Sequence, residues 1–141
     1  MSTEQNKAVV RRLIDEVFNQ GNISVVDDLA TPGFIEHEDL PPGMPAGREG
    51  VKMLTSAMHG AFPDFHAAIE DLIAEGDKVV LRMTWKGTQK GEFLGIPASG
   101  KHLDITVIDI LGFRDGKIVD HWGLMDNARM MQQLGAMPMP G

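Results

Sequence analysis

Residues 103–126, LDITVIDILGFRDGKIVDHWGLMD, contain two apolar stretches separated by the tetrapeptide Arg-Asp-Gly-Lys at 114–117. An Asp-Gly pair between two such stretches is typical of a tight turn, so we expect a β-hairpin that turns at Asp115 and Gly116. Each predicted strand also carries isolated charged residues. The register of the hairpin decides which face of the sheet these charges occupy, and therefore which chemistry is available.

Two registers are compatible with this turn. A two-residue loop pairs Ile110 with His121, whereas a type I turn followed by a bulged Gly116 pairs Asp109 with His121 and leaves Gly123 opposite Val107. The sequence Phe-Arg-Asp-Gly-Lys favours the bulged turn. Asp109 and His121 then lie side by side on one face, and the face is otherwise apolar: Leu103, Ile105, Val107, Leu111, Phe113, Val119 and Met125.

A carboxylate on an apolar surface is costly to ionise, and a neighbouring imidazolium relieves that cost. We therefore interpret Asp109 and His121 as the candidate catalytic residues, a general acid–base pair. The alternative is a buried structural pair that only holds the register of the hairpin. The opposite face of the same strands presents Trp122 with Ile108 and Ile110, an apolar patch that favours a homodimer interface.

The composition excludes several classes of function. A net charge of −7 without any basic cluster argues against binding to nucleic acid or to an anionic membrane. No apolar run reaches about 18 residues, so we expect no membrane span. The chain has no cysteine, which removes disulfides and thiolate chemistry and fits a cytoplasmic location. The histidines lack the spacing of a metal site, so we expect no metal.

The remaining patterns predict helices first and strands later. We expect helices over about 4–19, 24–30, 48–62 and 127–134, a short strand over 34–37, and a second hairpin formed by 65–74 and 77–86. The order indicates an α+β fold in which a strongly curved antiparallel sheet packs on three to four helices and encloses an apolar pocket. Residues 1–136 are expected to form a single domain and 137–141 a flexible C-terminal tail.

The pocket is expected to bind a hydrophobic small molecule. The aromatic residues and methionines could contact the ligand or could simply be buried in the core. One of Glu36 and His37 is expected at the mouth of the pocket. The expected substrate-binding residues are His37, Met58, Phe62, Phe65, Met83, Trp85, Val107 and Met125.

Several motifs resemble those of the SnoaL-like polyketide cyclases, also called ester cyclases, within the NTF2-like superfamily. They are VFNQGN at 17–22, AFPD at 61–64, GEFLGIP at 91–97 and DGKIVDHW at 115–122. The resemblance implies a cone of curved sheet and helices that is usually dimeric through the sheet. It also implies an intramolecular aldol closure of a polyketide ester, without metal or cofactor.

The same resemblance assigns individual positions. His121 falls on one histidine position of the family, Asp109 falls on another, and Gly123 falls where the characterised cyclases carry their principal aspartate. We therefore predict a cofactor-independent enzyme that uses acid–base chemistry on a hydrophobic carbonyl or ester compound, by ring closure, isomerisation or elimination. The alternatives are a non-catalytic dimer that binds a small molecule, and an epoxide or lactone hydrolase.

Overall fold

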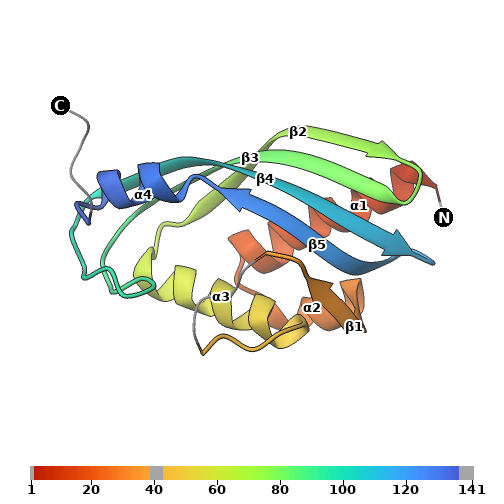
Figure 1. Ribbon diagram of the computed structural model, residues 1–141, viewed down its shortest axis with the longest axis horizontal. Coiled ribbons are helices and arrows are strands. Elements are labelled where there is room, and N and C mark those ends of the chain that lie inside the picture. The colour runs from red at the N-terminus through yellow and green to blue at the C-terminus, as the bar shows by residue number, and fades with distance from the viewer. Residues whose placement is uncertain (1, 39–42, 137–141) are drawn as a thin grey trace.

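The computed structural model describes residues 2–38 and 43–136, which form a curved five-stranded sheet with helices packed against it (Figure 1). The strands are β1 (Ala30–Glu36), β2 (His66–Glu75), β3 (Lys78–Thr88), β4 (His102–Arg114) and β5 (Lys117–Met125). The α-helices are α1 (Thr3–Arg12), α2 (Val26–Leu29), α3 (Arg48–Ala61) and α4 (Asn127–Gln133). The predicted α+β architecture is confirmed. The predicted tail at 137–141 lies outside the described residues, and the single domain over 1–136 stays a prediction.

The strand order in the sheet is β1-β5-β4-β3-β2. Strands β2 to β5 form an antiparallel meander, whereas β1 lies at the edge and runs parallel to β5. In Figure 1 the long strands arch above α2 and α3. The parallel edge strand was not predicted, and it matters because it brings residues near position 36 next to the hairpin with which the sequence analysis began.

The hairpin of β4 and β5 has a different register from the predicted one. Asp115 and Gly116 both have positive φ, 53° and 77°, so they form a two-residue turn of the I′ kind, in which Arg114 pairs with Lys117. A bulge follows, because Gly112 pairs with Asp120 while Phe113 pairs with Ile118. The predicted bulge at Gly116 is therefore wrong, since the extra residue lies within β5 instead.

The error in register amounts to two residues. His121 pairs with Leu111 and Asp109 pairs with Gly123, where the prediction had paired Asp109 with His121. Side chains alternate with a period of two along a strand, so a shift of two residues leaves every side chain of β4 and most of β5 on the expected face. One correction applies to β5: the bulge turns Ile118, rather than Val119, into the buried interior.

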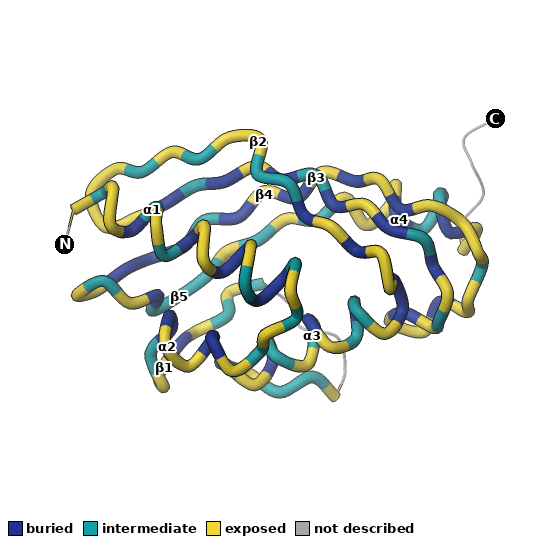
Figure 2. Tube along the Cα trace, turned by 180° about the vertical axis from the view of Figure 1, so that it is seen from behind, coloured by how far each residue is buried: buried dark blue, intermediate teal, exposed yellow. Residues whose placement is uncertain are grey.

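The alternation of burial along β4 defines the core. Its inward residues are 2–7% exposed, and Figure 2 shows buried and exposed positions following one another along the strand. Each large apolar side chain fully buried in this way contributes roughly 1.5–3 kcal/mol relative to exposure. The inward residues of β4 are Leu103, Ile105, Val107, Asp109, Leu111 and Phe113. Asp109 is the one charged group among them.

The helices close the other side of the core. Helix α1 begins at a capping box of Ser2 and Gln5 and continues as a π-helix over Leu13–Asn19, where a regular helix was expected. A 3₁₀ turn at Ile23–Val25 leads into α2. Asp126 caps the N-terminus of α4, accepting a hydrogen bond from the backbone N–H of Arg129 at 3.1 Å. Within the described residues, no helix has the combination of length and apolarity needed to cross a membrane.

Candidate active site

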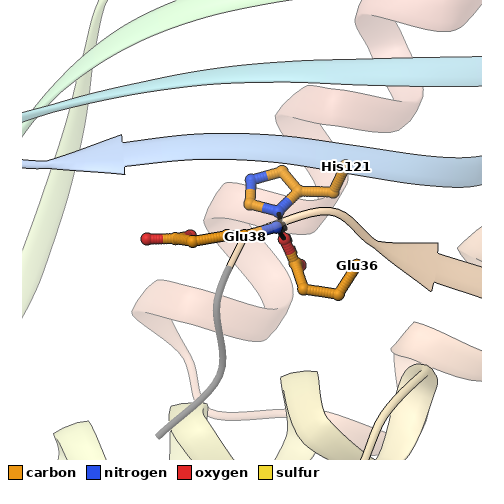
Figure 3. Close-up of side chains that lie close together, drawn as sticks. All are labelled: Glu36, Glu38 and His121. Carbon is orange, nitrogen blue, oxygen red and sulfur yellow. Dashed lines mark hydrogen bonds and ion pairs between the residues drawn. The ribbon is translucent and has the colours of Figure 1, made fainter.

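Three strands meet where Asp109, His121 and Glu36 come together. Asp109 lies on β4 and His121 on β5, while Glu36 is the last residue of β1 and is the register partner of His121. Figure 3 shows the imidazole of His121 extending from β5 toward the end of β1, where the carboxylate of Glu36 faces it. The expectation that Asp109 and His121 lie side by side agrees with this geometry, although they are diagonal neighbours rather than a register pair.

Both ring nitrogens of His121 face carboxylates. Nδ1 lies 2.6 Å from Oε2 and 2.8 Å from Oε1 of Glu36, and Nε2 lies 2.9 Å from Oδ1 of Asp109. The three side chains are only 10–17% exposed. When both carboxyl groups are ionised, both ring nitrogens donate to them and the ring is a doubly protonated imidazolium.

The ionisation of His121 follows from these contacts. Burial alone lowers the pKa of the imidazole, but hydrogen bonds to Asp109 and Glu36 and the charges of the two carboxylates outweigh burial and raise the pKa to about 10. A general base must be unprotonated before it can act. At neutral pH His121 is therefore a permanent positive charge, and the base must be a carboxylate.

Glu38 extends the cluster. Its backbone N–H donates to Oε1 of Glu36 at 3.0 Å, and ligand atoms of Glu36, Glu38 and His121 all lie within 4.8 Å of one another. Such a group has the spacing of a cation site. To bind a cation there, His121 would have to release a ring proton, and both of its ring nitrogens already contact carboxylates.

The cluster forms the polar end of an apolar pocket of about 200 Å³. The pocket wall combines the π-helix, α2, α3, the residues before α3 and the inner faces of β1, β4 and β5. Among the described lining residues, the ionisable side chains are Glu36, Glu38, Asp109 and His121. Representative apolar members are Leu13, Phe18, Phe34, Val51, Leu54 and Met125. An apolar pocket whose charged groups are gathered in one cluster suits a largely apolar ligand that carries a polar reactive group.

The eight predicted substrate-binding residues divide into three groups, of which His37 forms one by itself. Met125 lines the pocket. The side chains of six others are at most 6% exposed and pack in the core, outside the described lining of this pocket: Met58, Phe62, Phe65, Met83, Trp85 and Val107. The aromatic members pack against each other and against neighbouring rings, as in the edge-to-face pair of Phe65 and Trp85 at 5.4 Å. A binding role for these six stays a prediction.

His37 points away from the pocket. Its ring stacks on Trp122 with 4.2 Å between centroids, and its Nε2 lies 3.2 Å from Oδ2 of Asp120. Adjacent residues of a strand point to opposite faces, and Glu36 takes the inward direction here. Of the two residues expected near the pocket mouth, the structure therefore places Glu36 in the pocket. Glu36 is placed there by the parallel pairing of β1 with β5, which no pattern in the sequence predicts.

The sheet is curved and unclosed, it packs on helices, and a pocket with an acid–base cluster lies between the two layers. This architecture is that of an NTF2-like α+β protein. The chain belongs to the SnoaL-like polyketide cyclase family, whose family model matches residues 8–134. This is a family of cyclase-type enzymes, and the predicted family and fold are both confirmed.

Individual relatives are similar over nearly the whole chain. The aklanonic acid methyl ester cyclase DauD of Streptomyces sp. strain C5 is 31% identical, over 90% of this chain and 80% of that protein. The aklanonic acid methyl ester cyclase DnrD of Streptomyces peucetius is also 31% identical, over 96% of this chain and 92% of that protein. Among solved structures, TsrD from Streptomyces laurentii has a TM-score of 0.88 and 31% identity, covering 97% of this chain and 99% of TsrD.

Proposed function

We propose that the protein catalyses a proton transfer next to a carbonyl group of a hydrophobic ester or ketone, without a cofactor, leading to intramolecular ring closure. The observation that carries this proposal is the buried carboxylate of Asp109, held by the His121 imidazolium at the polar end of an apolar pocket. The two curated relatives are named as cyclases of a methyl ester, which supports a polyketide-like ester as the substrate class.

The reaction uses Asp109 as the base and then as the acid. The carboxylate takes a proton from the carbon next to a carbonyl, and the C–H electron pair forms an enolate. The enolate carbon attacks a second carbonyl of the same molecule, forming a carbon–carbon bond and an alkoxide. The alkoxide takes the proton back from the Asp109 carboxyl group, so the product is an isomer of the substrate and the enzyme is regenerated.

His121 and Glu36 support that base. The imidazolium lies 2.9 Å from Oδ1 of Asp109 and compensates the negative charge that the carboxylate carries on an apolar wall. Glu36 holds the other side of the ring through Nδ1 and keeps it charged and oriented. The mostly apolar lining lowers the local dielectric constant, which strengthens the electrostatic stabilisation of a developing enolate.

The two alternatives have less support. A hydrolase built on paired acids and an arginine needs an arginine in the pocket, but Arg82 lies on the exposed side of β3, bound to Asp71 at 2.7 Å, and the described lining contains no arginine. A non-catalytic binding protein requires the same pocket and differs only in leaving its ligand unchanged. Isomerisation or elimination would begin with the same proton abstraction.

The test compares Asp109→Asn with Asp104→Asn. Asp104 lies on the same strand with an exposed side chain, so the chemical change is matched while the pocket is left intact. A naphthyl β-keto methyl ester is incubated with each protein in D₂O, and NMR follows exchange of the proton between the two carbonyls above the spontaneous rate. We expect Asp109→Asn to lose at least about 100-fold of the catalysed rate and Asp104→Asn to keep it.

A catalysed rate that Asp109→Asn leaves unchanged would remove Asp109 from the mechanism. No catalysed exchange in the wild-type protein, together with saturable binding of the ester, would favour the binding protein over the enzyme. Circular dichroism of both variants checks that the fold is retained.

We also propose a homodimer formed through the outer face of the sheet, and a cytoplasmic location. Large apolar side chains on and beside that face are well exposed: Trp122 (38%), Ile108 (46%), Ile73 (63%) and Leu124 (73%). Exposure of this kind is typical of an interaction surface. Light scattering on the purified protein tests the dimer, and a monomer mass at micromolar concentration would contradict it.

A further inference from the structure

A side chain at position 123 would collide with the ends of three side chains of the acid–base cluster. A Cβ atom built on this glycine would lie 2.6 Å from Cε1 of His121, 2.7 Å from Oδ1 of Asp109 and 2.8 Å from Oε2 of Glu38. Real Cβ atoms essentially never approach other heavy atoms closer than 3.0 Å. Three functional groups from three parts of the chain therefore converge on the point that any other residue would fill.

The backbone does not explain the glycine. Gly123 has no positive φ, unlike Gly116 in the adjacent turn, so an L-residue could adopt its conformation without strain. Glycine within a strand weakens the strand, because it packs no side chain and loses more conformational freedom on folding. A glycine that costs stability and is not needed for the backbone indicates a close approach of other groups.

The register explains which groups approach. Gly123 is the partner of Asp109 across β4 and β5, and its neighbour on the same face of β5 is His121. The diagonal contact between Asp109 and His121 passes over Gly123. Glu38 reaches the same place from the segment that follows β1. The three side chains of the cluster therefore lie directly over the Cα atom of Gly123.

We propose that Gly123 is a positioning residue, whose missing side chain allows Asp109, His121 and Glu38 to converge above β5. The proposal rests on the function given above for the meaning of the cluster, but it concerns the geometry alone. A side chain at position 123 would meet the His121 ring first, since Cε1 is the nearest atom, and would force the ring away from Asp109 or Glu36.

The matched pair of variants is Gly123→Ala and Gly60→Ala. Gly60 lies in α3, and a Cβ atom there has nothing within 4 Å, so the same added methyl group has free space. NMR measures the titration of the His121 ring in each protein. In Gly123→Ala we expect the midpoint to fall by at least about one pH unit, because the ring loses a carboxylate contact, and in Gly60→Ala we expect no change.

An unchanged His121 titration in a folded Gly123→Ala protein would overturn the proposal. If Gly123→Ala does not fold, the same change is made in a His121→Ala background, which removes the nearest atom. We expect the methyl group to cost less stability there, because the closest of the three contacts is gone while those with Asp109 and Glu38 remain. Equal damage in both backgrounds would also overturn the proposal. None of these readouts measures turnover, so this test stays valid even if the proposed function is wrong. Likewise, an unchanged His121 titration in Gly123→Ala would not contradict the proposed function.

Discussion

The protonated state of His121 predicts how the stability of the protein depends on alkaline pH. The perturbation is a rise in pH, applied to the wild-type protein and to His121→Asn. The pKa of His121 is about 10 in the folded protein, against an ordinary value of 6.5. Because the folded pKa is the higher one, the ion pairs of His121 contribute stability that is fully present below pH 6.5. That stability is lost as the pH rises through 10.

The magnitude follows from the two values. At about 1.4 kcal/mol for each pH unit between them, the complete contribution is about 5 kcal/mol. Solvent screening reduces this free energy only slightly, because the His121 side chain is 17% exposed. Of this contribution, proton linkage gives a loss of about 3 kcal/mol between pH 6 and pH 9. Such a loss is a large part of the stability of a typical domain.

The assay is urea unfolding at several pH values between 6 and 10. We expect the free energy of unfolding of the wild-type protein to fall by about 3 kcal/mol more than that of His121→Asn between pH 6 and pH 9. His66→Gln is the control, because His66 is exposed at the start of β2, and it should follow the wild-type curve. The ring carbon shifts of His121 provide a second measurement and should report imidazolium at pH 8.

Parallel curves for the wild-type protein and His121→Asn would refute the reasoning, because the variant has no imidazole to titrate. If His121→Asn does not fold, the NMR measurement decides by itself. A neutral His121 ring at pH 8 would then show that the two carboxylates do not hold the proton.

Two further predictions concern the pocket and the core. Leu54→Trp places a bulky ring in the pocket wall and should weaken binding of the naphthyl ester by at least about 10-fold. Met53→Trp, on the exposed side of α3, is the control and should leave the affinity unchanged. Equal affinities of the two variants for the ester would contradict the assigned pocket. Phe62→Ala should lower the free energy of unfolding by about 3–5 kcal/mol, since Phe62 is fully buried against Phe93. A change below about 1 kcal/mol in chemical unfolding would show that Phe62 faces a cavity rather than the core.

The inner face of the main hairpin could be predicted because alternation is a local property of the sequence. Apolar residues at every second position place Asp109 among buried neighbours whatever the turn is. The register could not be settled in the same way, since Asp115 and Gly116 fit two turns and the structure adds a bulge within β5. Asp109 and His121 still lie on the same face because the error in register is an even number of residues.

Glu36 and Glu38 could not be placed from the sequence, because their position depends on a pairing between distant segments. Glu36 and His121 are 85 residues apart, and a parallel strand pair has no turn that would mark it. The sequence could not distinguish residues that line the pocket from residues of the core, for a related reason. Phe62 and Leu54 are both apolar residues of one helical region, and only the packing of the helices decides which one borders empty space.

The edge position of β1 has a kinetic consequence for the acid–base cluster. Within the described part of the chain, β1 is paired with β5 alone, and through that pairing it carries Glu36. Edge elements of this kind open locally at a lower free energy than the whole domain needs to unfold. The lifetime of the complete cluster is therefore set by the fraying of one short strand. Hydrogen exchange at the backbone N–H of His37, which donates to the carbonyl of His121 at 2.9 Å, reports that lifetime directly.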